Sequence, residues 1–270
     1  MRMLCSGAAR SLFSSSVSLT FSSPKRHLKL SSFSFFKPYS HSSPHKSPIK
    51  MSRTTIEHIV LFKVKDNTDP TKVNTMLNSL NSLVSLDAVL HIAAGPLYRV
   101  KSSPISFTHM LHSRYSSKDN LNAYSAHPSH VTAVKESVLP ICEDIMAVDW
   151  IADDLQGPVV PAPGSAIRLT FLKLKENLRE DVKNEILAVI KGIKGNFGEI
   201  NQITCGENFS PARAKGYSIA SLAVFPTVSE MEAVDSKEEL VNLQKEKVRD
   251  YLESVIVVDY VVPSPQSASL

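Results

Sequence analysis

The apolar residues of this chain recur in two spacings, which predict alternating strands and helices. Residues 56–65 are largely β-branched and apolar on both faces, which is typical of a strand buried on both sides. Asp69 before Pro70 predicts a helix start, and apolar residues follow at helical spacing as far as Val84. The elements expected next are a strand at 89–94, a loop at 101–104, a strand at 105–114, a helix from Ser117 to Tyr124, a longer helix from Pro128 to about Leu139 and a strand at 145–151.

This order of elements returns in the second half of the chain. Residues 107–151 align with residues 217–261 without a gap, and Val148-Asp149 recurs as Val258-Asp259. The stretch at 156–164 is rich in proline and glycine and predicts a linker between the two copies. The second copy is expected to contain strands at 166–174, around 200–204, at 217–225 and at 254–262, a helix at 179–193, a short helix from Val228 and a longer one from Lys237.

Each copy therefore has the order β-α-β-β-α-β, with its second helix broken in two. That order predicts an α+β, ferredoxin-like unit, a four-stranded antiparallel sheet with helices on one face. Because the strands are apolar on both faces, we expect the two repeats to pack sheet to sheet as a dimeric-type α/β barrel. One chain is then a pseudo-dimer, and a homodimer of chains is also possible. The predicted parts are a leader (1–50), a first domain (54–152), a linker (153–164), a second, degenerate domain (165–262) and a tail (263–270).

Residues 1–50 have the composition of an organelle transit peptide. They contain eight Lys and Arg, fifteen Ser and no acidic residue, and their apolar stretches are too short to span a membrane. The alternative is a disordered tail that carries no targeting signal. Without these residues the net charge changes from +4 to −4, and no basic stripe with interleaved aromatics is present, which argues against nucleic-acid binding. Cys142 and Cys205 stand alone in different repeats, so we expect neither a disulfide framework nor a cysteine metal site.

The candidate chemistry lies in one repeat. All six histidines after residue 50 lie in the first copy, and the segment with Tyr124, His127 and His130 becomes Val234, Lys237 and Leu240 in the second. This loss predicts one polar pocket per chain, with the second repeat mainly closing the barrel. A tyrosine hydroxyl can stabilise an oxyanion and a neutral histidine can accept a proton near pH 7, so Tyr124 and His130 form a candidate catalytic pair. The alternative is structural, with Tyr124 in the core and His127 as a helix N-cap before Pro128.

Three segments resemble the stress-response A/B barrel family of plants, also called dimeric α/β barrel or Dabb. They are Ile56-Glu-His58-Ile-Val-Leu-Phe-Lys, Phe107-Thr-His109 and Tyr124-x-x-His127-Pro-x-His130. The first repeat matches by these motifs, and the second by apolar pattern and element order. The resemblance implies a pocket that includes His58, His109 and His127, with His58 and His109 pointing into the barrel. One relative, olivetolic acid cyclase, uses the tyrosine and the last histidine of this motif for an aldol condensation.

Three functions follow from this resemblance. The first is a small-molecule-binding barrel associated with stress response, without established catalysis and with an unknown small molecule as partner. The second is a polyketide-cyclase-like enzyme that uses Tyr124 and His130 for aldol cyclisation. The third is an interaction scaffold with no ligand. No cofactor is required by any of them.

Two metal sites come into question. The resemblance implies a structural Mg²⁺ held by the backbone carbonyls of Leu83, Leu86 and Val89, and ordinary capping of the helix end by the loop is the alternative. His127 and His130 could chelate zinc or copper, but no Cys or carboxylate is spaced to complete that site.

The localisation signals conflict. Ala268-Ser269-Leu270 resembles the degenerate plant peroxisomal tripeptides, which predicts recognition by the peroxisomal import receptor. The leader indicates a chloroplast or a mitochondrion instead. Met51 could serve as an internal start, which favours the peroxisome.

Overall fold

The computed structural model of this chain describes residues 54–153 and 155–263. The predicted leader and the tripeptide Ala268-Ser269-Leu270 lie outside the described residues. The described residues belong to one compact unit, and that unit contains both repeats. Within it, no described helix is both long and apolar enough to cross a membrane.

The predicted order of strands and helices is present in both repeats. The first repeat contains β1 (Thr55–Val64), α1 (Pro70–Ser82), a 3₁₀ turn (Leu83–Ser85), β2 (His91–Pro96), β3 (Arg99–Ser102), β4 (His109–Tyr115), α2 (Lys118–Ala126), α3 (Pro128–Ala133), a π turn (Val134–Val138) and β5 (Cys142–Ala152). The second contains β6 (Ala166–Leu174), α4 (Glu180–Asn196), β7 (Gln202–Glu207), a 3₁₀ turn (Pro211–Arg213), β8 (Ile219–Phe225), α5 (Val228–Asp235), α6 (Glu238–Arg249) and β9 (Leu252–Val261).

Local sequence signals account for the helix starts. The Asp69 carboxylate accepts a hydrogen bond from the backbone N–H of Thr71 at 2.8 Å, and Pro70 takes the first helical position. The Ser117 hydroxyl caps α2 in the same way, accepting from the N–H of Asn120 at 3.1 Å. The duplicated turn after the first strand of each repeat uses an asparagine in the left-handed region, with φ of 59° at both Asn67 and Asn177.

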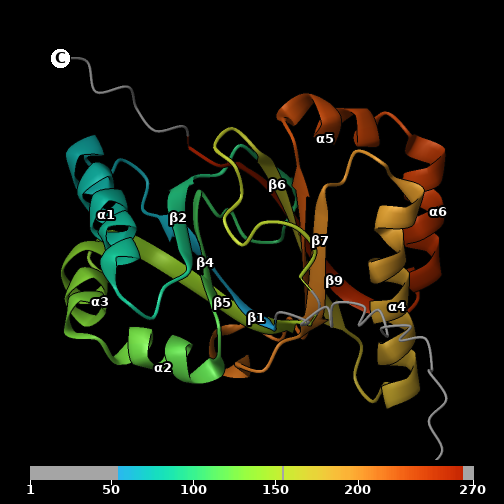
Figure 1. Ribbon diagram of the computed structural model, residues 1–270, viewed down its shortest axis with the longest axis horizontal. Coiled ribbons are helices and arrows are strands. Elements are labelled where there is room, and N and C mark those ends of the chain that lie inside the picture. Colours follow the sequence, from blue (N-terminus) through green and yellow to red (C-terminus); the bar gives the residue numbers. More distant parts are fainter. Residues whose placement is uncertain (1–53, 154, 264–270) are drawn as a thin grey trace, which may run out of the picture. The chain divides into compact units, whose positions relative to one another are not determined.

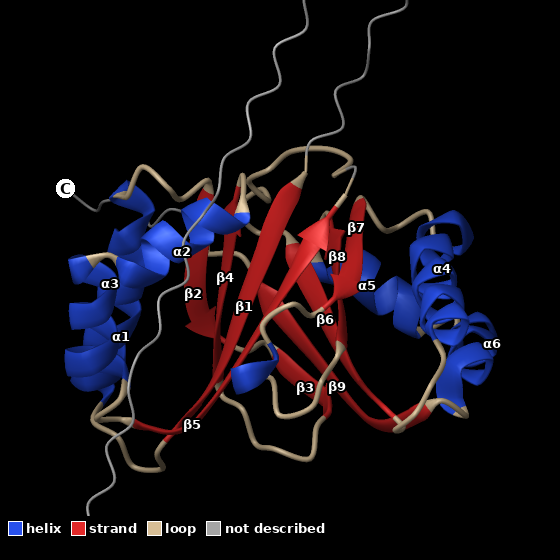
Figure 2. Cartoon of the chain, turned by 90° about the horizontal axis from the view of Figure 1, so that it is seen from below, coloured by secondary structure: helices blue, strands red, loops and turns tan. Residues whose placement is uncertain are grey.

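The strands form two antiparallel sheets, in the orders β2-β4-β1-β5 and β3-β9-β6-β8-β7. Figure 1 shows α1, α2 and α3 beside the first sheet and α4, α5 and α6 beside the second. Figure 2 shows the strands of both sheets in the middle, with helices on the two outer sides. The fold is therefore the predicted ferredoxin-like α+β arrangement, with two repeats packed sheet to sheet.

The prediction of a loop at 101–104 is wrong for its first two residues. Arg99–Ser102 forms β3, which leaves the first repeat and pairs with β9 of the second sheet, with Arg99 opposite Asp259. This pairing satisfies backbone groups of β9 that would otherwise lie at a sheet edge. No local pattern of apolar residues marks so short and exposed a strand.

Both faces of β1 are buried, as its apolar pattern predicts. Ile59 and Leu61 lie in the core between the two sheets, together with Leu169 and Phe171 of β6. The alternate residues of β1 face the helices and pack with residues of α1 and α2, namely Ile56, Phe62 and Val64 against Met76, Leu80, Leu121 and Tyr124. The open face of each sheet is covered by the other repeat, so neither sheet exposes this apolar surface to water.

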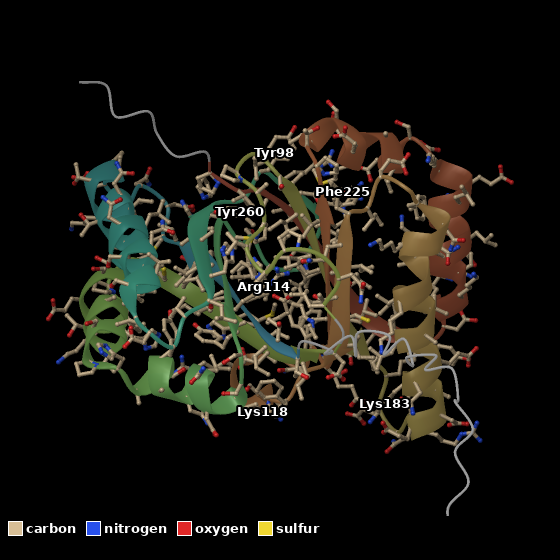
Figure 3. The ribbon with its side chains drawn as sticks, viewed as in Figure 1. Tyr98, Arg114, Lys118, Lys183, Phe225 and Tyr260 are labelled. Carbon is tan, nitrogen blue, oxygen red and sulfur yellow. The ribbon has the colours of Figure 1, made fainter. Side chains whose placement is uncertain are left out.

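A buried polar network joins the repeats within the inter-sheet core. Glu57 accepts hydrogen bonds from Arg114 at 2.8 Å and from Thr204 of the second repeat at 3.0 Å. His112 lies 2.7 Å from the same carboxylate, and Arg114 also donates to Gln202 of the second repeat at 2.7 Å. Figure 3 shows Arg114 in the middle of the molecule, among the strands. Each charged group here is buried and partnered, as burial of charge requires.

Candidate functional site

Tyr124 and His130 meet at the break between α2 and α3. Pro128 begins α3, while the N–H of His127 closes α2 by donating to the Tyr124 carbonyl at 3.1 Å. This change of direction brings the ring centroids of Tyr124 and His130 to 4.5 Å. Tyr124 is 1% exposed and His130 is half-buried, so the pair lies at the inner side of the break with one member open to a ligand.

His130 is held in one tautomer. Its Nδ1 lies 2.9 Å from the carbonyl of Ser125, and a carbonyl can only accept, so Nδ1 carries the proton and Nε2 is left as an acceptor. Burial lowers the pKa of His130; the Ser125 carbonyl opposes this shift, and the nearby His58 and Arg213 add to it. His130 is therefore a neutral base at neutral pH.

Tyr124 is held as a donor. Burial raises the pKa of its hydroxyl to about 12, so the group stays protonated at neutral pH. The ring also lies near Tyr115 and His58, with centroids at 5.2 Å and 6.3 Å. The Tyr115 hydroxyl is itself 2.9 Å from the hydroxyl of Ser113. A protonated phenol beside a neutral imidazole can donate to a carbonyl oxygen while the imidazole accepts a proton.

A second acid–base pair adjoins Tyr124. His58 of β1 and Asp149 of β5 face each other in register, and Nδ1 lies 2.5 Å from Oδ1. Burial by itself raises the pKa of Asp149, but the charge and hydrogen bond of His58, with the Ser210 hydroxyl, outweigh it and hold the pKa below its ordinary value. The ionised carboxylate orients the imidazole, so that His58 presents its other nitrogen, Nε2.

Asp149 and Tyr115 are site residues that sequence reasoning missed. The available signal was the recurrence of Val148-Asp149 as Val258-Asp259, which places an acidic residue at the same point of an apolar strand in both repeats. Strand pairing then places Asp149 opposite His58. Tyr115 carried no such signal, because an aromatic residue at the end of a strand is common in a core.

The second repeat completes this site through the loop after β7. Phe209 packs against the helix-side core of the first repeat, and the Lys118 ammonium lies 4.1 Å from its ring centroid. The N–H of Asp149 donates to the side chain of Asn208 at 3.1 Å, and the N–H of Phe209 donates to the Asp149 carbonyl at 3.0 Å. Figure 3 places Lys118 on α2, on the side where this loop arrives.

His58 and His109 do not point between the sheets, contrary to the expectation taken from the resemblance. Both stand on the helix-facing side of their strands, and His109 pairs with Phe62, a residue of the helix-side core. The alternation predicts which residues share a face, but both faces of these strands are apolar, so it leaves open which one faces inward. His109 lies four residues beyond Ser113, the partner of His58, and is thus roughly 13 Å from the cluster. It bonds instead to Thr108, at 2.8 Å.

His127 has a structural role at the helix start. Its side chain is exposed, and its Nδ1 accepts from the N–H of Ser129 at 3.2 Å, which makes it the N-cap of α3. It also lines, with Tyr124, a cavity of about 310 Å³ beneath the loop that contains Leu86 and Asp87. This concave space therefore adjoins Tyr124 of the candidate pair.

Two of the three carbonyls considered for Mg²⁺ accept backbone hydrogen bonds after the end of α1. The carbonyl of Leu83 accepts from the N–H of Leu86 at 3.1 Å, and the carbonyl of Leu86 accepts from the N–H of Val89 at 2.9 Å. In the part of the chain that the structure describes, no three His, Cys, Asp or Glu residues gather in a metal-binding cluster. At two of the three positions these hydrogen bonds fit the capping alternative, and the Mg²⁺ site at this helix end stays a prediction.

A second cavity beside the helices lies in the second repeat, where the sequence predicts a mainly structural role. Its volume is about 550 Å³, and it lies between the sheet and helices α4, α5 and α6. The prediction of one polar pocket per chain does not cover this space, because its lining is mostly apolar.

Comparisons with known proteins agree with the tandem fold. A stress-response A/B barrel domain-containing protein of Arabidopsis thaliana is 56% identical over 272 residues, which cover 99% of this chain and 100% of that relative. A second protein of the same description and plant is 50% identical over 211 residues, which cover 77% of this chain and 97% of that relative.

Two solved structures share the fold at 11% identity. One is a candidate monooxygenase of Fusobacterium nucleatum, with a TM-score of 0.56 over 78% of this chain and 93% of its own. The other is an anthrone oxidase-like protein, with a TM-score of 0.50 over 81% of this chain and 97% of its own. The model of the Stress responsive A/B Barrel Domain, Dabb, matches residues 56–152 and again residues 167–262. With both repeats matched, the chain belongs to the stress-responsive A/B barrel family and carries two copies of its domain in tandem.

Proposed function

We propose that the first repeat binds a small carbonyl compound at the Tyr124–His130 pair. The observation that carries this proposal is the approach of the two rings to 4.5 Å, one a protonated phenol and the other a neutral imidazole with a free Nε2. The phenol donates a hydrogen bond to the carbonyl oxygen, and the imidazole faces the adjacent carbon. The buried rings around Tyr124 provide an apolar setting in which such a hydrogen bond is strong.

A proton transfer is the second candidate function, and the His58–Asp149 pair favours it. In this step Nε2 of His130 takes a proton from the carbon next to the carbonyl. The electron pair of that C–H bond moves into an enolate, whose oxygen accepts a hydrogen bond from Tyr124. Attack of the enolate carbon on a second carbonyl of the same molecule would give an aldol, and the resulting alkoxide would recover the proton from His130. His58, oriented by Asp149, supplies a second imidazole near Tyr124.

The binding claim can be tested with a simple aryl ketone, since the natural ligand is not identified. We would titrate acetophenone into the full chain labelled with ¹⁵N-histidine and follow the side-chain nitrogen signals. The signals of His130 and His58 should shift saturably, because the ketone enters beside them. His109 is the internal control, since it lies roughly 13 Å from the cluster and its signals should stay unchanged.

Variants make the test specific. Tyr124→Phe removes only the hydroxyl and should weaken acetophenone binding by about tenfold, the contribution expected of one hydrogen bond in an apolar site. His109→Gln should leave the affinity unchanged. Saturable binding with equal affinity in the Tyr124→Phe variant, or shifts confined to other histidines, would contradict the proposal.

A further inference from the structure

The helices of the second repeat stand over a cavity that is large enough for a ligand. Its volume of about 550 Å³ lies within the range of roughly 300–1,000 Å³ that is usual for small-molecule sites. Its walls are mainly buried apolar side chains from β6, α4 and β8, among them Leu172, Ile190, Phe197 and Phe225. Figure 1 shows α4 and α6 standing beside the strands of this sheet.

The cavity follows from a change of side-chain size between the repeats. In the gapless alignment, Tyr124 corresponds to Val234 and Leu111 to Ser221, and both of these second-repeat residues line the cavity. In the first repeat the same two positions carry the larger side chains of Tyr124 and Leu111, which pack in the helix-side core. The smaller side chains of Val234 and Ser221 therefore leave the cavity open in the second repeat. Apolar space of this size is destabilising when it holds nothing, which favours an occupant.

Positive charge dominates the polar part of this cavity. Four basic residues line it against two acidic ones, and they are Lys101, Arg168, Lys245 and Arg249 against Asp235 and Glu246. Arg168 is held on two sides, donating to Asp259 from Nε at 2.8 Å and to Asp235 from Nη1 at 2.7 Å. The guanidinium is thereby fixed in place where His58 stands in the first repeat.

The Lys101 ammonium can donate hydrogen bonds to a ligand as well as to Asp235. It arrives on β3, the strand that crosses from the first repeat, and its ammonium pairs with Asp235. An ammonium carries three N–H groups, and about a third of this side chain is exposed, so Lys101 can also bind an anion at the cavity wall. Arg99 arrives on the same strand and adds a cation to the Asp235–Asp259 cluster.

We propose that the second repeat binds a free monocarboxylate with an apolar tail, such as a medium-chain fatty acid. The carboxylate pairs with Lys101, beside the positioned guanidinium of Arg168, and the tail lies along the wall formed by Leu172, Ile190, Phe197 and Phe225. This site is separate from the one in the first repeat and needs none of its histidines.

A fluorescent fatty acid tests the proposal on the full chain. Dansyl-undecanoic acid should bind saturably below its micelle concentration, with a blue shift of its emission. Decanoic acid should displace it at least about tenfold more effectively than decanol, because only the acid carries the charge that Lys101 recognises. Absence of saturable binding, or equal displacement by acid and alcohol, would overturn it.

Two kinds of variant locate the site. Lys101→Gln should weaken the acid by about tenfold while Lys191→Gln, the same change on the exposed face of α4, leaves it unchanged. Val234→Tyr and Ser221→Leu restore side-chain sizes of the first repeat and should abolish probe binding, with unfolding midpoints equal to or above that of the wild type. Undiminished probe binding in Lys101→Gln or in the folded Val234→Tyr variant would place the probe elsewhere and reject the assignment.

Discussion

Nδ1 of His58 lies 2.5 Å from the carboxylate of Asp149, its cross-strand neighbour. Arg168 and Asp259 occupy the same two positions in the second repeat, with Nε 2.8 Å from Oδ1. The duplicated frame thus keeps a buried acid–base pair in both halves. The first repeat carries an imidazole at this position, whereas the guanidinium of the second repeat stays protonated.

Asp149→Asn should impair chemistry in the first repeat more than it impairs folding. An asparagine fits the space but cannot hold the His58 imidazole through a charged hydrogen bond. We expect the rate of ketone α-proton exchange to fall by about tenfold or more. Glu143→Gln on the same strand is the control, because this exposed residue pairs with Lys63 at the surface and its loss should change neither rate nor stability. Equal rates for Asp149→Asn and the wild type would remove the pair from the mechanism.

Glu57→Gln should destabilise the interface between the two repeats. Burial alone would raise the pKa of Glu57, but Arg114 and His112 hold it well below its ordinary value, so the carboxylate is charged. Removing that charge leaves the buried Arg114 guanidinium without its charged partner, which costs about 3–5 kcal/mol in the free energy of unfolding.

Urea denaturation would measure this loss. The matched control is Glu253→Gln, which breaks the surface pair with Lys173 and should change the stability by less than about 1 kcal/mol. A loss for Glu57→Gln no larger than for Glu253→Gln would show that the network does not hold the repeats together.

The protein should become less stable as the pH falls below 7. Burial lowers the pKa of His91 to about 2 and lowers that of His112, so both are neutral in the folded protein. In the unfolded chain they take up protons near pH 6.5, so the stability they contribute is complete above that pH and is lost as the pH falls through it. His91 alone should account for about 2 kcal/mol between pH 7 and pH 5.

This pH dependence is checked by urea denaturation at the two pH values. In the His91→Phe variant, which carries no titratable group at that position, the difference between pH 7 and pH 5 should shrink by about the same 2 kcal/mol. An unchanged difference in this variant would show that His91 is not the group responsible.

Gly206→Ala should be destabilising because β7 and β5 approach each other closely there. A Cβ at this position would lie 3.0 Å from the carbonyl oxygen of Ile151 and 3.1 Å from the side chain of Trp150. We expect a loss of about 1–3 kcal/mol in a thermal or urea unfolding experiment. Gly192→Ala in α4, where nothing lies within 4 Å, should instead stabilise by about 0.5–1 kcal/mol. Loss of stability in both variants alike would point to a general effect of removing glycine.

Much of the fold could be predicted from periodicity and capping. The spacing of apolar residues and the Asp69-Pro70 start predict β1 and α1. The alignment of residues 107–151 with 217–261 predicts that β4, α2, α3 and β5 recur as β8, α5, α6 and β9. The burial of both faces of β1 follows from the apolar residues that it carries on each face. These features are local, so the sequence contains them directly.

The parts that could not be predicted depend on contacts between distant segments. Strand β3 exists because the edge of β9 accepts it, and Phe209 reaches the first repeat through a loop with no pattern of its own. The second cavity results from the small side chains of Ser221 and Val234. Neither residue has a reactive side chain that would mark a site in the sequence. The alternation of residues along β1 could not predict that His58 faces the helices, because both faces of this strand are apolar.

The most direct test of the first-repeat site is deuterium exchange into the methyl group of acetophenone in deuterated water at neutral pH, followed by ¹H NMR. The wild-type chain should accelerate the exchange over buffer, and Tyr124→Phe and His130→Gln should each reduce that acceleration by about a hundredfold, while His109→Gln retains it. A chain that does not exceed buffer, or variants of Tyr124 and His130 that exchange as fast as the wild type, would contradict the assignment of an acid–base site to this pair.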